Sequence, residues 1–180
     1  MIAKIVAVLA ILAVLALWLF WTARRLDRLH ARIDAAAAAL DAQLARRDAH
    51  VLEFCEAVTL PRGVDLQLRS AVAAADLVSG LGHDREVVEN AVTHALAHAV
   101  RVSPRSFLEP SGAATDLHDE ALRASFARGF YNDTVRDALV IRDRRMVRWL
   151  RLAGRAPHPA YFEMFDEELP VAPIPLAERA

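Results

Sequence analysis

A chain of 180 residues has room for one compact domain and a short additional segment. Its formal net charge of -1 excludes a strongly basic protein that is attracted as a whole to nucleic acid. Cys55 is the single cysteine, which excludes an internal disulfide and a zinc site built from thiolates of this chain, while abundant alanine and only 6 glycines favour long helices.

The N-terminal segment predicts a membrane-spanning helix. Every residue from Ile5 to Trp21 is apolar, and with residues 1–3 the segment reaches the roughly 20 residues that a helix needs to cross a bilayer. A cleaved signal peptide would have a shorter apolar run followed by small residues at its cleavage site. Here the run ends in bulky aromatics, Phe20 and Trp21, that suit the membrane interface. We therefore expect an anchor over residues 1–23 that is retained.

The charges that flank this segment predict its orientation. Only Lys4 and the terminal amine precede the apolar run, whereas four arginines follow it closely: Arg24, Arg25, Arg28 and Arg32. Positive charge is enriched on the cytoplasmic side of membrane proteins. We expect a single-pass protein whose C-terminal body lies in the cytoplasm.

The next segment predicts a long amphipathic helix that continues the anchor. Its apolar residues recur mostly three or four positions apart: Leu26, Leu29, Ile33, Ala36, Leu40, Leu44, Val51, Phe54 and Val58. Pro61 and Gly63 are expected to end it. Cys55 lies on the apolar side, so we expect a buried structural thiol.

Three further helices are predicted in the body. The second runs from about Asp65 to Val78 and is broken by residues 79–82. Asp84 is the expected N-cap of the third, which ends at Ser103 and Pro104. Its expected apolar side comprises Val87, Val88, Ala91, Val92, Ala95, Leu96, Ala99 and Val100.

The fourth helix is expected to begin at Thr115 or Asp116 and to extend to about Ala153, with Gly154 as its C-cap. Its expected apolar positions are Leu117, Ala121, Leu122, Phe126, Phe130, Val135, Leu139, Val140, Met146, Val147 and Leu150.

These elements predict an all-α fold, because no stretch alternates apolar and polar residues with the period of a strand. We expect an N-terminal transmembrane helix followed by an antiparallel bundle of about four long helices over residues 24–154. Prolines exclude regular helix from most of the tail, residues 155–180. The tail also carries four large apolar side chains, and we expect that part to dock on the bundle: Tyr161, Phe162, Met164 and Phe165.

Several segments of the chain are similar to those of a known family. The most specific is the run Phe130, Tyr131, Asn132, Asp133, Thr134, Val135, Arg136, Asp137, and residues 41–47, 89–96 and 160–162 also contribute. With the N-terminal anchor, these segments resemble the LemA family of bacterial membrane proteins. Ala37 replaces that family's usual tryptophan, and residues 51–55 lack its proline, so the chain resembles a divergent member. The resemblance implies a long-helix bundle at a bacterial cytoplasmic membrane, in a family with no established enzymatic reaction.

The histidines offer the best candidate for metal chemistry. His94 and His98 lie four residues apart and share one helix face, and His83 and His118 are possible neighbours. A zinc hydrolase would need a Glu after His94, where the chain has Ala95. We therefore favour surface or helix-packing histidines, and we identify no catalytic or cofactor-binding residues.

Polar residues of the last helix have structural and lipid-binding interpretations. We favour a structural role for Tyr131 and Asn132, which if buried would need partners and would fix helix register. Asp133, Arg136 and Asp137 are expected to form a solvated or interhelical network of ion pairs. Five arginines make the far end of this helix basic: Arg142, Arg144, Arg145, Arg148 and Arg151. They either complement the helix C-terminus or contact anionic lipid.

The sequence favours a non-enzymatic, membrane-anchored scaffold or adaptor that binds a membrane or membrane-proximal protein. An anchor, extensive amphipathic helix and no recognisable active-site motif motivate this prediction. Two alternatives stay open: a ligand-sensing or enzyme-associated bundle, and a lipid-contacting protein that remodels membranes. A homo-oligomer also stays open, whereas nucleic-acid binding is not expected.

Overall fold

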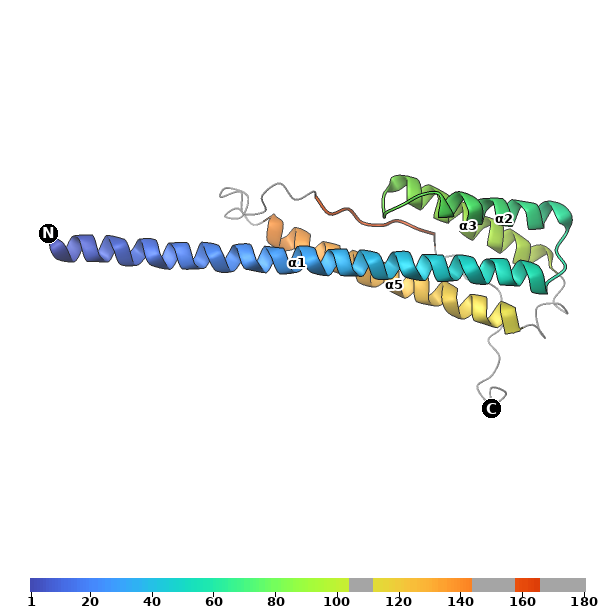
Figure 1. The fold of residues 1–180 in the computed structure, drawn as a ribbon, viewed down its shortest axis with the longest axis horizontal. Coiled ribbons are helices and arrows are strands. Elements are labelled where there is room, and N and C mark those ends of the chain that lie inside the picture. The colour runs from blue at the N-terminus through green and yellow to red at the C-terminus, as the bar shows by residue number, and fades with distance from the viewer. Residues whose placement is uncertain (104–111, 144–157, 166–180) are drawn as a thin grey trace, which may run out of the picture. The chain divides into compact units, whose positions relative to one another are not determined.

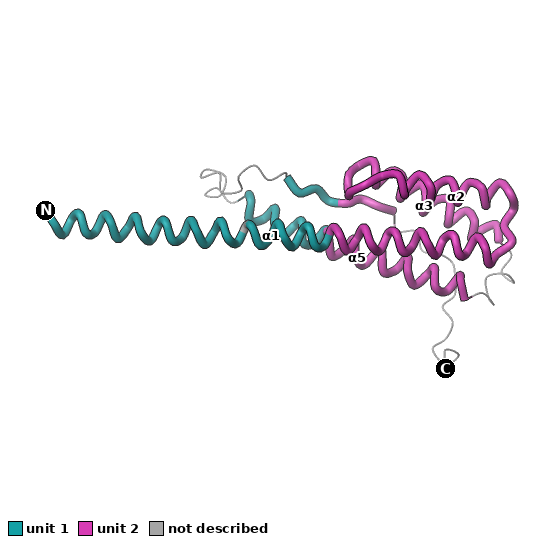
Figure 2. Tube along the Cα trace, viewed as in Figure 1, with its two compact units in different colours: residues 1–36, 132–161 teal, residues 37–131, 162–180 magenta. Residues whose placement is uncertain are grey.

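The computed structural model describes residues 1–103, 112–143 and 158–165. These residues contain no strand and form four helices: α1 (Ile2–Ala57), α2 (Arg62–Asp76), α3 (His83–Val102) and α5 (Gly112–Arg142) (Figure 1). The prediction of an all-α fold is therefore confirmed. Two compact units share these helices, because α1 and α5 each contribute residues to both (Figure 2).

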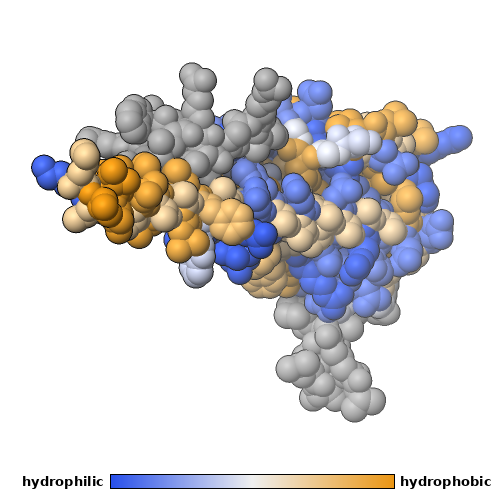
Figure 3. All heavy atoms as spheres, turned by 60° about the vertical axis from the view of Figure 1, so that its left-hand side comes forward, coloured by the Kyte–Doolittle hydropathy of each residue, from blue (hydrophilic) through white to orange (hydrophobic). Residues whose placement is uncertain are grey.

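Unit 1 comprises residues 1–36 and 132–161. The first half of α1 provides the one described segment that is long and apolar enough to cross a membrane, and none of it is buried by the rest of the described chain. In Figure 3 this segment forms the orange surface that projects toward the viewer. Among the described residues of this unit, the buried apolar side chains are Ala36 of α1 and Val135 and Ala138 of α5. Small side chains allow two helices to approach closely.

Unit 2 comprises residues 37–131 and 162–180 and contains the main hydrophobic core. α1 buries the side that its spacing predicted, including Leu40, Leu44, Val51 and Phe54. α2 contributes Leu68, α3 contributes Val92, Leu96 and Val100, and α5 contributes Leu117. Burying one such side chain stabilises the fold by about 1.5–3 kcal/mol.

Helix boundaries differ from the predictions at two turns. α2 begins at Arg62, and Pro61 is its N-cap with a ψ of 136° that lies outside the helical range. Gly82, in an extended conformation, is the N-cap of α3, so the assignment of Asp84 to that position was wrong. Asp84 lies in the first turn of α3, where its negative charge still interacts favourably with the helix N-terminus.

On α3 and α5, some residues predicted to be buried are exposed. On α3, Val87 and Ala91 are exposed, while Arg85 and Glu89 are buried. On α5, Phe126 and Phe130 were expected in the core but are exposed. The described part of α5 ends at Arg142, and its predicted continuation to about Ala153 lies outside the described residues.

The segment 162–165 packs against unit 2 in an irregular conformation. Phe162 is fully buried, and two backbone amides donate hydrogen bonds to side chains of α3. Glu163 N donates to Glu86 Oε1 at 2.8 Å, and Phe165 N donates to Asn90 Oδ1 at 2.8 Å. Side chains of a helix thus replace the backbone partners that this segment lacks.

Candidate functional site

The histidines singled out in the sequence are not gathered at one place. His94 and His98 are exposed on α3, and the ring of His94 faces Phe165 at 5.3 Å between centroids. His83 Nδ1 lies 3.2 Å from Glu86 Oε2, and His118 is half-buried on α5. Within the described ranges, no three His, Cys, Asp or Glu residues are arranged to hold a metal ion.

The segment from Phe130 to Asp137 is divided between interior and surface. Tyr131 is buried, and burial together with the charge of Glu86 raises the pKa of its phenol. Asn132 is half-buried. Asp133 and Arg136 form an exposed ion pair with a 2.9 Å contact, which contributes at most about 1 kcal/mol. Asp137 is exposed and lines a pocket described below.

The remaining candidates are one thiol and the arginines at the end of α5. Cys55 is buried, and desolvation raises the pKa of its thiol to about 11. The thiol is therefore protonated at neutral pH and unsuited to act as a nucleophile. Arg142 is half-buried at the end of α5. The other predicted lipid contacts lie outside the described residues: Arg144, Arg145, Arg148 and Arg151.

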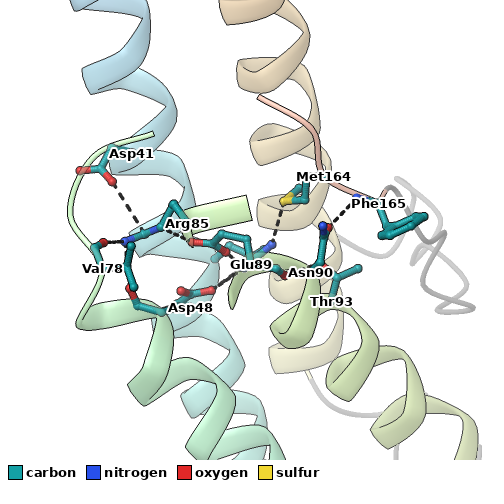
Figure 4. A network of polar contacts seen from close by, with 11 residues as sticks. Asp41, Asp48, Val78, Arg85, Glu89, Asn90, Thr93, Met164 and Phe165 are labelled. Carbon is teal, nitrogen blue, oxygen red and sulfur yellow. Dashed lines mark hydrogen bonds and ion pairs between the residues drawn. The ribbon is translucent and has the colours of Figure 1, made fainter. Parts of the chain in front are cut away.

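Unit 2 contains a buried network of four charged side chains that the sequence did not reveal (Figure 4). Arg47, Asp48, Arg85 and Glu89 have exposed fractions of 3%, 7%, 6% and 0%. Glu89 joins two arginines: its Oε1 accepts from Arg85 Nε at 2.7 Å, and its Oε2 accepts from Arg47 Nη2. Arg47 Nη2 also donates to Asp48 Oδ1 at 2.8 Å. Two positive and two negative groups thus compensate one another away from water.

Arg85 connects this network to the end of α2. Its Nη1 donates to the backbone oxygen of Ala75 at 2.9 Å and to that of Val78. The last carbonyls of a helix have no partner within that helix. Val78 N donates to the Ala75 oxygen at 3.1 Å, and the guanidinium from α3 adds another donor to the same oxygen. The buried charges therefore hold α1, α2 and α3 in one register.

Arg47 also reaches the C-terminal segment. Its Nη1 lies 3.6 Å from Met164 Sδ, and the backbone of the neighbouring residues is held by α3. Burial of Asp48 raises the pKa of its carboxyl to about 6, although the charge of Arg47 opposes that rise. Arg47 therefore connects the network to Met164, while Glu86 and Asn90 of α3 hold the backbone of the same segment.

One signal in the sequence could have identified these residues. The apolar side of α1 has a gap between Leu44 and Val51, and Arg47 and Asp48 fall into it at helical spacing. Arg85 and Glu89 are four residues apart, as an ion pair within one helix requires. Their partnership across 42 residues needs the tertiary structure.

Unit 1 contains a second charged site, a pocket of about 500 Å³ between α1 and α5. Three arginines of α1, Arg25, Arg28 and Arg32, line it with Asp137 of α5. Its apolar lining residues are Leu29, Val140 and Ile141. We call this site the basic pocket.

Comparisons with protein-family models, with curated proteins and with solved structures found no match to this chain. The resemblance to the LemA family therefore depends on the segments quoted above. The features that bear on function are the buried charged network, the basic pocket and the apolar segment of α1.

Proposed function

We propose that the protein is a membrane-anchored helical scaffold that presents its body to a protein partner beside the bilayer, without an enzymatic activity of its own. One observation carries this proposal: α1 is a single helix of 56 residues that begins with the apolar segment and ends in the core of unit 2. The same element would thus serve as anchor and as the central support of the body. The body lies in the cytoplasm in this proposal, and the chain is a divergent LemA-like protein.

The buried charges favour a structural over a chemical role for the body. Glu89 accepts from both Arg47 and Arg85, and Arg85 also donates to a carbonyl of α2. A group that acts on a substrate must have an atom free to meet it, whereas here both carboxylate oxygens of Glu89 already accept from arginines. Their contacts suit a rigid support.

An exposed apolar surface on α5 supports a protein partner. Leu122 and Phe126 lie one helical turn apart and are 45% and 75% exposed. Large aromatic side chains dominate the binding energy of many protein interfaces. In this proposal the partner covers Phe126.

Site-specific photocrosslinking in native membranes tests the proposal. A photoreactive residue at Phe126 should yield a reproducible crosslinked protein, identified by mass spectrometry. The matched control carries the same group at Arg46, an exposed position on the polar side of α1. Absence of crosslinks at position 126, or equal products at both positions, would contradict a specific partner.

The anchor and its orientation need a separate measurement. The full chain should stay with membranes after alkaline carbonate extraction, and protease added outside spheroplasts should leave the body intact. Release by carbonate would contradict the anchor, and digestion of the body would contradict the cytoplasmic location.

A further inference from the structure

The basic pocket of unit 1 differs from other charged clusters because its arginines are not neutralised. Within the described part of the chain, the side chains of Arg25, Arg28 and Arg32 have no hydrogen bond or ion pair. A guanidinium stays charged at every physiological pH, and among the described residues that line the pocket Asp137 is the one acidic residue. The lining residues therefore provide an excess of positive charge in a concave site.

The side chains at this site match the chemistry of a phosphate group. Arginine donates from a planar fork that fits the oxygens of phosphate, and several arginines can share one anion. The apolar residues Leu29, Val140 and Ile141 line the same pocket, and attraction between opposite charges is stronger beside apolar surface than in bulk water. An anion of this kind would find the charges it needs already in place.

A neighbouring hollow adds an apolar surface to the same site. Phe20, Trp21, Arg24 and Arg28 line this second hollow, whose volume is about 240 Å³. Arg28 belongs to both hollows, and Arg24 lies over the ring of Phe20 at 4.8 Å. Aromatic and cationic surfaces are thus adjacent, as an amphipathic ligand requires.

The position of these residues along α1 matches the depth of lipid headgroups. A helix rises 1.5 Å per residue, so Arg25 and Arg28 lie about 6 Å and about 10 Å beyond Trp21, the last residue of the apolar run. The headgroup layer on each side of a bilayer is roughly 5–8 Å thick. If the apolar run fills the hydrocarbon, Arg25 lies within the headgroup layer, and the long side chain of Arg28 can extend back along α1 to reach it. Arg32 lies about 16 Å beyond Trp21 and lines the side of the pocket that is farther from the bilayer.

We propose that the basic pocket binds the phosphate of an anionic membrane phospholipid, whose acyl chain lies along Phe20 and Trp21. This inference rests on the proposed anchor and specifies what the anchor recognises. The lipid would sit between α1 and α5 of unit 1 and neutralise Arg25, Arg28 and Arg32. Such binding would give the protein a preference for anionic membranes.

Native mass spectrometry of the full chain, released from detergent micelles with phosphatidylglycerol or phosphatidylcholine, measures this binding. The wild type should retain phosphatidylglycerol in preference to phosphatidylcholine. Arg25→Gln, Arg28→Gln and Arg32→Gln combined should weaken phosphatidylglycerol binding by about 100-fold. The matched control combines Arg46→Gln, Arg62→Gln and Arg136→Gln, three exposed arginines outside the pocket, and should stay within about twofold of the wild type. Equal losses in both triple variants, or no loss in the pocket variant, would overturn the proposal.

A variant with the opposite effect keeps the test independent of folding. Asp137→Asn removes the negative charge that the described lining residues contribute, so phosphatidylglycerol binding should tighten by about fivefold. Weaker binding in Asp137→Asn would contradict a phosphate site. Far-UV circular dichroism of each variant should match that of the wild type.

Competition distinguishes a lipid from a soluble phosphate compound. Inorganic phosphate and glycerol phosphate lack an acyl chain, so neither should displace phosphatidylglycerol at equal concentration. Displacement by either would overturn the assignment to a lipid. Failure of the anchor would appear separately, as release of the protein by carbonate, whereas a retained protein with no lipid preference refutes the pocket alone.

Discussion

The two charged sites of this chain use the same side chains with opposite results. In unit 2, Arg47 and Arg85 are buried and each contacts a carboxylate. In unit 1, Arg25, Arg28 and Arg32 line an open pocket, and among the described residues they contact no carboxylate. The comparison teaches that pairing, rather than residue type, separates an arginine that supports the fold from one available to a ligand.

The largest test removes the shared carboxylate of the buried network. Glu89→Gln replaces the carboxylate that Arg47 and Arg85 share by a neutral amide, while both arginines stay buried. The free energy of unfolding should therefore fall by about 3–5 kcal/mol. Chemical denaturation of the full chain in micelles, followed by far-UV circular dichroism, measures it. Glu53→Gln is the matched control, because Glu53 forms an exposed pair with His50. A loss below about 1 kcal/mol at Glu89 would mean that the network is not a support.

The second test uses pH. Burial raises the pKa of Asp48 to about 6 from 3.8, so the native state binds this proton more tightly than the unfolded chain does. The stabilising contribution is full below the unfolded pKa and is lost as pH rises through about 6. Wild type relative to Asp48→Asn should therefore lose roughly 2 kcal/mol between a pH of about 4 and 7. Parallel stability curves for the two proteins would refute this.

Substitution of Tyr131 should have an intermediate effect on the free energy of unfolding, because it removes a single neutral hydroxyl. Tyr131→Phe should lower the free energy of unfolding by about 1 kcal/mol. An ultraviolet absorbance titration of the wild type should show a phenol that ionises above its usual pKa of 10.0, since burial and Glu86 both oppose its negative charge. Persistence of that transition in Tyr131→Phe would assign it to another residue.

The three arginines of the basic pocket should contribute little to the stability of the fold. Arg25→Gln, Arg28→Gln or Arg32→Gln, made singly, should change the free energy of unfolding by less than about 0.5 kcal/mol, because exposed side chains without partners contribute little to folding. Denaturation under the conditions used for Glu89→Gln measures it. A loss above about 2 kcal/mol would place that arginine with the structural group instead.

The spacing of apolar residues was sufficient to predict the helices and the all-α fold. Leu40, Leu44, Val51 and Phe54 recur with helical period and are buried, because a helix must cover its apolar side. The predicted N-cap of α3, Asp84, was wrong, because Gly82 adopts the extended conformation that an N-cap needs and the helix begins directly after it. Local chemistry thus fixes element type better than element ends.

The charged sites could be predicted only in part. Helical spacing places Arg47 on the apolar side of α1, yet its partner Glu89 lies 42 residues away on another helix. Hydrophobicity alone favoured Val87 and Ala91 over Arg85 and Glu89 for the interior of α3, because it ignores ion pairs that form between helices. Arg25, Arg28 and Arg32 were visible as flanking charge, whereas the opposing Asp137 depends on how α5 packs.

The contact between Arg47 and Met164 has a consequence for biosynthesis. Met164 lies 117 residues after Arg47 along the chain, so all of these residues must be synthesised before this contact can form. Until then Arg47 and Asp48 interrupt the apolar side of the emerging α1 with charge. The nascent helix therefore exposes charged side chains in the middle of its apolar side, which limits aggregation until the rest of the body has been synthesised.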